Sequence, residues 1–179
     1  MKMQIPFPFR ARRFRDDVHG VSAVEFALLL PLMLTMYLGG LEVSQAIATS
    51  RKVTLVSRAV ADLASQVSKI TSADMTALLE ASATVISPYP SGTLKVTVSQ
   101  VKIDANGDAT IDWSATHGGT LRSGTASPPA GLKVANTYLI WAEAEYTYVP
   151  TFGSGITGSL ALTDQLYMRP RVSNSVTYP

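Results

Sequence analysis

The chain has 179 residues and no cysteine, which allows one domain or one domain with an anchor and excludes a disulfide framework, a thiolate metal site and a cysteine nucleophile. The length also excludes a large multidomain enzyme. Hydrophobic residues make up 46% of the chain and charged residues only 16%, so a solvated, disordered chain is excluded as well. The formal net charge of the whole chain, +2, favours no class of partner. The charged residues are, however, unevenly distributed along the chain.

Residues 1–20 form a basic leader with a local charge of +3. The leader has two acidic side chains, Asp16 and Asp17, and five basic ones, which are Lys2, Arg10, Arg12, Arg13 and Arg15. Basic residues beside an apolar segment are retained on the cytoplasmic side of a membrane. We therefore expect a cytoplasmic N-terminus and no nucleic-acid partner, because setting the topology and contacting anionic lipid explain the arginines.

Residues 21–41 form an apolar segment of bilayer length. As a helix these 21 residues extend about 31 Å, which matches a hydrocarbon core of about 30 Å. The core helix of a soluble protein is rarely apolar on every face for this length. The sequence therefore predicts a transmembrane helix, with residues 42–179 outside the cytoplasm.

Two simpler interpretations of the apolar segment remain open. One is a secretory signal peptide, for which Ala46-Ile47-Ala48 offers a cleavage site, but the apolar run is longer than usual and this site lies beyond Glu42 in a predicted helix. The other is a plain single-pass anchor that is never cut.

Glu25 favours a third interpretation, because a carboxylate five residues into a membrane helix is costly without a partner. Cleavage between Gly20 and Val21 would give Val21 a positively charged α-amine, four residues from Glu25. The carboxylate would then pair with this amine or with that of a neighbouring subunit. The alternative is that Glu25 lies at the headgroup boundary and reaches water.

The start of the apolar segment, with the glycine before it, reads Gly20-Val21-Ser22-Ala23-Val24-Glu25-Phe26-Ala27-Leu28-Leu29-Leu30-Pro31. This stretch resembles the start of the TadE-like proteins, which are pilin-like proteins of the tight-adherence (Flp-type) pilus system. The resemblance covers about the first 60 residues, continuing weakly through Gly39-Gly40-Leu41-Glu42. It implies that Gly20 precedes the bond cut by a prepilin peptidase, and that Glu25 with Phe26 forms an acidic motif used in processing or assembly. The leader departs from the pattern in carrying Asp16 and Asp17 close to the cut.

The membrane helix is expected to continue as an amphipathic extension over residues 42–70. An apolar stripe with helical spacing follows the segment, consisting of Val53, Val56, Val60, Leu63, Val67 and Ile70. We expect this stripe to pack on the protein's own head rather than on a second subunit, and the helix to run to about Lys69. Pro31 predicts a mild kink, and Gly39-Gly40 a place to bend.

Residues 71–179 are expected to form an extracytoplasmic α+β head. A capping box at Thr71-x-x-Asp74 begins a second helix, with a buried side that consists of Met75, Leu78, Leu79, Val85 and Ile86. Strands are predicted at 94–103, 109–114, 137–149 and about 165–172, with an Asn-Gly turn after the first and a long loop over 116–136. The predicted fold is a long N-terminal helix with a small antiparallel sheet.

Three apparent chemical motifs have simpler explanations. The oxygen-bearing side chains of Asp104-x-Asn106-Gly107-Asp108 are spaced like the calcium ligands of an EF-hand loop. Position 12 of that loop must be acidic and is Ala115 here, so we interpret the segment as a hairpin turn. The pattern from Gly153 to Gly158 resembles a dinucleotide loop, yet only 21 residues follow it, too few for the rest of the motif. With two histidines, His19 and His117, we expect no metal, cofactor or catalytic triad.

The sequence thus predicts a non-enzymatic minor pilin or pseudopilin of a tight-adherence, type IVb/IVc-like pilus. The protein itself is expected in the bacterial inner membrane. Its expected partners are a prepilin peptidase, other pilin-like subunits, inner-membrane pilus assembly proteins and membrane lipid. The alternative is an uncleaved single-pass protein with a periplasmic domain that binds a ligand or partner.

Overall fold

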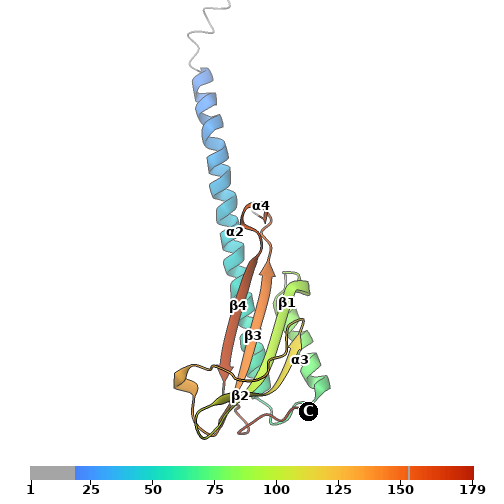
Figure 1. The fold of residues 1–179 in the computed structure, drawn as a ribbon. Coiled ribbons are helices and arrows are strands. Elements are labelled where there is room, and N and C mark those ends of the chain that lie inside the picture. The colour runs from blue at the N-terminus through green and yellow to red at the C-terminus, as the bar shows by residue number, and fades with distance from the viewer. Residues whose placement is uncertain (1–18, 153) are drawn as a thin grey trace, which may run out of the picture. The chain divides into compact units, whose positions relative to one another are not determined.

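The computed structural model describes residues 19–152 and 154–179, and its fold is α+β, as predicted. A long helix is followed by a shorter helix and four strands (Figure 1): α2 (His19–Ser65), α3 (Ser72–Val85), β1 (Leu94–Ile103), β2 (Ala109–His117), β3 (Thr137–Tyr148) and β4 (Leu160–Met168). A helical turn, α4 (Ser154–Thr157), lies between β3 and β4. The chain forms two compact units, which meet in the sequence between Leu41 and Glu42.

The second unit contains an antiparallel sheet with the strand order β2-β1-β3-β4. Helix α3 and the part of α2 that belongs to this unit lie on one face of the sheet (Figure 1). The main core fills the space between helices and sheet, and its fully buried members include Val53, Val56, Val60, Met75, Val96, Val98, Ile140 and Ala142. Burial of these side chains is the main term that stabilises the unit.

The apolar stripe on α2 packs on the head, with one exception. Val53, Val56 and Val60 are completely buried, whereas Leu63 is 49% exposed and Ala64 is buried in its place. A helix has 3.6 residues per turn, so a stripe extended in strict steps of three and four drifts off the buried face. The prediction for Leu63 was therefore wrong.

Helix α2 ends at Ser65, four residues before the predicted end near Lys69. Beyond it, the backbone pairs with the C-terminal segment instead of continuing the helix: Ile70 N donates to the Thr177 carbonyl oxygen at 3.0 Å, and Thr177 N donates to the Ser68 carbonyl oxygen at 3.0 Å. Helix α3 then begins as predicted, with the Thr71 hydroxyl accepting a hydrogen bond from the Asp74 backbone N–H.

The strand boundaries differ from the prediction mainly at β4, which covers Leu160–Met168 and not 165–172. This strand pairs with β3 from Tyr148 opposite Leu160 to Ile140 opposite Met168. Its position is set by the partner strand, and Pro170 lacks the N–H needed to continue a ladder. Strand β2 is also longer than predicted and ends at His117.

The long loop after β2 covers part of the other face of the sheet. A second, smaller core forms there around Val101, Ile103, Ala109 and Leu139, and Ala126 and Leu132 of the loop pack against it. Strand β1 is therefore buried along nearly its whole length, although its sequence alternates. The predicted Asn-Gly turn between β1 and β2 is confirmed, since one Asp104 carboxylate oxygen accepts hydrogen bonds from the backbone N–H groups of Asn106 and Asp108, at 2.8 Å each.

Candidate functional site

The first candidate site is the apolar surface of α2 from Gly20 to Tyr37, where every side chain is exposed. Phe26 is 59% exposed, Leu28 73% and Met36 72%. A soluble protein rarely leaves apolar residues exposed on all sides of a helix, because their contact with water costs free energy. This surface requires either lipid or other apolar helices around it.

The sequence-predicted site residues lie on this surface. Gly20 and Val21 are exposed in the first turns of α2, and Val21 and Glu25 lie on one side of the helix, as a spacing of four residues requires. Within the described part of the chain, Glu25 has no ion-pair partner. The basic residues of the leader, with Asp16 and Asp17, lie outside the described residues.

Pro31, where the sequence predicts a mild kink, lies within α2. A proline has no backbone N–H, so one hydrogen bond of the preceding turn is lost. One turn after the proline, the Thr35 hydroxyl donates a hydrogen bond to the Pro31 carbonyl oxygen at 2.8 Å, which gives this carbonyl an additional partner.

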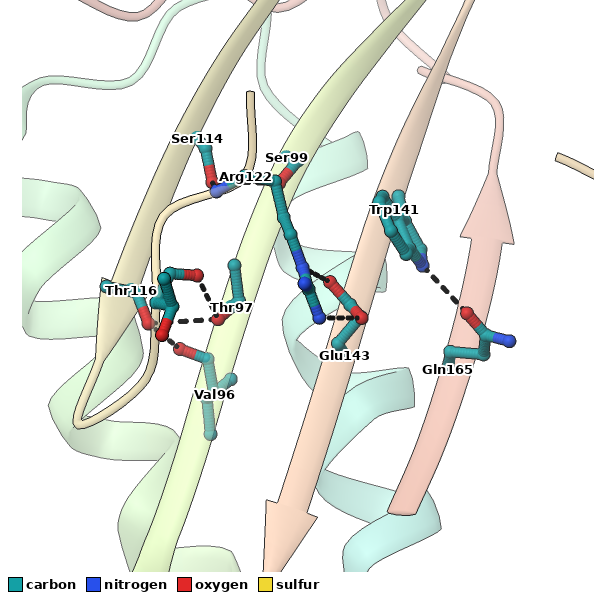
Figure 2. A network of polar contacts seen from close by, with 10 residues as sticks. Val96, Thr97, Ser99, Ser114, Thr116, Arg122, Trp141, Glu143 and Gln165 are labelled. Carbon is teal, nitrogen blue, oxygen red and sulfur yellow. Dashed lines mark hydrogen bonds and ion pairs between the residues drawn. The ribbon is translucent and has the colours of Figure 1, made fainter. Parts of the chain in front are cut away.

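The second candidate site is a polar hollow of about 660 Å³ on the sheet face away from the helices, lined mainly by Lys95, Thr97, Arg122, Glu143, Glu145 and Gln165. Glu143 and Glu145 of β3 alternate with buried alanines, so both carboxylates point to this face. Figure 2 shows Arg122 reaching from the long loop to Glu143, which it binds through two hydrogen bonds of 2.8 Å. These two hydrogen bonds raise the pKa of the Arg122 guanidinium.

Hydroxyl pairs join β1 and β2, and one of them also holds the loop that carries Arg122. The Thr97 and Thr116 hydroxyls are 2.9 Å apart, and so are those of Ser99 and Ser114 (Figure 2). The Ser114 hydroxyl also accepts the Arg122 backbone N–H at 3.0 Å. The period-two pattern of β3 placed the glutamates on one face, but no sequence signal placed Arg122 beside them.

Both basic side chains of the hollow are paired with glutamates of β3. Arg122 pairs with Glu143 and lies 5.6 Å from the Trp141 ring centroid, and Lys95 pairs with Glu145 at 2.9 Å. Among the described residues, no cluster of three or more His, Asp or Glu side chains is placed to hold a metal ion. The hollow offers hydrogen bonds to a polar ligand, without a nucleophile paired with a base.

A third site links α2 to the connection between β3 and β4, inside the second unit. The Glu42 carboxylate accepts a hydrogen bond from the Tyr148 hydroxyl at 2.8 Å and another from the Phe152 backbone N–H at 2.7 Å. The Phe152 hydrogen bond, followed by that of Tyr148, lowers the pKa of Glu42. Burial and the Glu42 charge raise the pKa of Tyr148 to about 12.

The structure and the comparisons with known proteins agree about the N-terminal part. Among the described residues, α2 is the one helix that is long and apolar enough to cross a membrane, and its apolar window has no buried residue. The sequence model of the TadE-like protein family matches residues 20–62, which are 43 of the 179 residues. No curated protein and no solved structure was found to match the chain. The resemblance is thus confirmed for this segment: residues 20–62 are TadE-like, which fits a membrane protein associated with a tight-adherence pilus.

Proposed function

We propose that the protein is a non-enzymatic minor pilin or pseudopilin of a tight-adherence (Flp-type) pilus, cut by a prepilin peptidase after Gly20. The observation that carries the proposal is the position of the family match, which begins at Gly20 and includes the acidic motif Glu25-Phe26. The same residues lie on a helix whose apolar surface is exposed. Association, and not turnover, is the mechanism that such a surface supports.

Cleavage supplies the partner that Glu25 lacks within the described chain. The new α-amine of Val21 is positive and lies one helical turn from the Glu25 carboxylate, or meets that of an adjacent subunit when helices bundle. In either case a positive and a negative charge enter lipid together, which lowers the desolvation cost of each. Exposed side chains such as Phe26 and Leu28 then pack against other pilin-like helices and inner-membrane assembly proteins.

The test is N-terminal sequencing of the protein from membranes with and without the prepilin peptidase. We expect a chain that begins at Val21 only when the peptidase is present. Gly20→Val should block the cut without disturbing the fold, because a side chain at Gly20 meets no atom within 4 Å. Gly40→Ala is the matched control, since its surroundings are equally open and it lies far from the cut.

Each other outcome contradicts processing at Gly20. An intact Met1 in both membranes supports an uncut single-pass protein with a periplasmic domain, for which the polar hollow is the ligand site. A chain that begins near Thr49 indicates export by signal peptidase.

A further inference from the structure

The connection between β3 and β4 carries no charge and exposes apolar side chains. Between Glu145 and Asp164 the sequence has no acidic or basic residue. Val149 and Phe152 of the connection are 59% and 62% exposed, and Leu160, the first residue of β4, is 43% exposed. Connections that contact water are usually polar, and apolar side chains gathered on one exposed connection mark a contact surface.

Hydrogen bonds fix where this connection lies along α2. Phe152 donates its backbone N–H to one carboxylate oxygen of Glu42, and the other oxygen accepts from Tyr148. Glu42 is the first residue after the apolar segment 21–41. The connection therefore lies at the level of α2 where the apolar segment ends.

The contacts of Glu42 suit a boundary between lipid and water. Each of its two oxygens has a donor, one from the end of β3 and one from the connection, so the carboxylate keeps polar partners where water becomes scarce.

We propose that Val149, Phe152 and Leu160 form a second membrane contact, seated in the headgroup boundary of the leaflet from which α2 emerges. The proposal rests on the proposed function only in that α2 spans the membrane. Lipid is the occupant because Glu42, which binds the connection, directly follows the apolar segment in the sequence, and because the connection offers no charge for recognition of a protein partner. Apolar side chains at such a boundary enter lipid by about 5–10 Å.

The absence of cysteine allows the proposal to be tested with single labels on the full chain. An environment-sensitive fluorophore is attached to Val149→Cys, to Tyr37→Cys in the apolar segment, or to Val172→Cys. The protein is reconstituted at low density in vesicles of phosphatidylethanolamine and phosphatidylglycerol, with or without nitroxide-bearing lipid as quencher.

Val172 is the matched control, because it is 66% exposed, close to the exposure of Val149, but lies at the other end of the head. Its neighbour Arg171 donates its N–H to the Ser65 carbonyl oxygen. Along the helix, Ser65 is roughly 35 Å from Glu42.

We expect a blue shift and quenching by the lipid nitroxide at positions 37 and 149, and neither at 172. Adding Phe152→Asp should abolish the shift at position 149, whereas Val172→Asp should leave it unchanged. Because Phe152 is largely exposed, its replacement leaves the core intact.

Four results would overturn the contact. If only position 37 is quenched, the connection lies in water while the membrane span stands. A shift at 149 without lipid quenching indicates a protein neighbour, and quenching at 172 indicates that the whole head lies on the bilayer. If position 37 is itself in water, the span fails, and the contact fails with it.

Discussion

At the scale of single residues, two glutamates of α2 differ in how their charge is satisfied. Glu42 has two hydrogen-bond donors from its own chain, whereas Glu25 has no ion-pair partner within the described part of the chain. An unpaired carboxylate on an apolar helix that enters lipid costs about 2.5–3.5 kcal/mol at the bilayer centre. That cost explains why an amine created by cleavage would favour assembly.

Replacement of Glu25 by alanine removes the charge without adding bulk. We expect Glu25→Ala to leave the protein in the membrane at the normal level and to abolish pilus formation, as seen by electron microscopy and by immunoblots of membrane fractions. Glu80→Ala, an exposed glutamate on α3, is the matched control and should leave pili unchanged. Normal piliation in the Glu25 variant would contradict the assembly role.

At the scale of elements, the second unit depends on contacts that connect distant parts of the chain. Glu42 of α2 holds the β3–β4 connection, and the Ser57 hydroxyl of α2 donates to Asp164 of β4. Arg122 joins the long loop to β3. These polar contacts fix positions that burial alone leaves free, because hydrophobic contacts are not directional.

The Glu42 contact gives stability that depends on pH. Its pKa in the folded protein is lower than the ordinary value of 4.5, so the contribution is present above that value and is lost as the pH falls below it. The pKa of Tyr148 is raised from 10.0 to about 12, so its contribution is present below pH 10 and is lost as the pH rises toward 12.

We therefore expect Glu42→Gln to lower the temperature at the midpoint of thermal unfolding, measured in detergent, between pH 4.5 and pH 10. The difference from the unchanged protein should shrink as the pH falls below 4.5, the ordinary pKa of a glutamate. Circular dichroism at a series of pH values measures this. A difference that stays constant down to pH 2 would show that the Glu42 charge does not stabilise the fold.

At the scale of the whole molecule, the two units are stabilised in different ways. The core clusters consist of residues that follow Glu42 in the sequence, and the segment before it exposes its apolar side chains. The second unit has its own core, which is the property of a segment that folds alone. The first unit requires lipid or other helices instead.

A chain that begins at Glu42 should therefore be soluble and unfold cooperatively in urea. Within it, Val56→Ala should lower the free energy of unfolding by about 2 kcal/mol, because Val56 is completely buried. Leu55→Ala, at the neighbouring and half-exposed position, should change it by less than about 0.5 kcal/mol. Equal effects of the two substitutions would contradict the packing of α2 described above.

Local patterns in the sequence determined the apolar helix, the TadE-like motif, the start of α3 and the first hairpin. Each depends on residues close together in the chain, such as Thr71 with Asp74 or Asp104 with Asn106. Helical period, capping and turn chemistry are local effects, so they can be predicted from a short window.

Only the tertiary structure decided where α2 ends, which residues form β4, and which surfaces of the head are polar. Helix α2 gives way to pairing with Thr177, and β4 takes its position from β3. Arg122 meets Glu143 because a loop with no pattern of its own folds back over the sheet. Such contacts join residues far apart in the chain, and the free energy that selects them comes from packing and hydrogen bonds absent from any single segment.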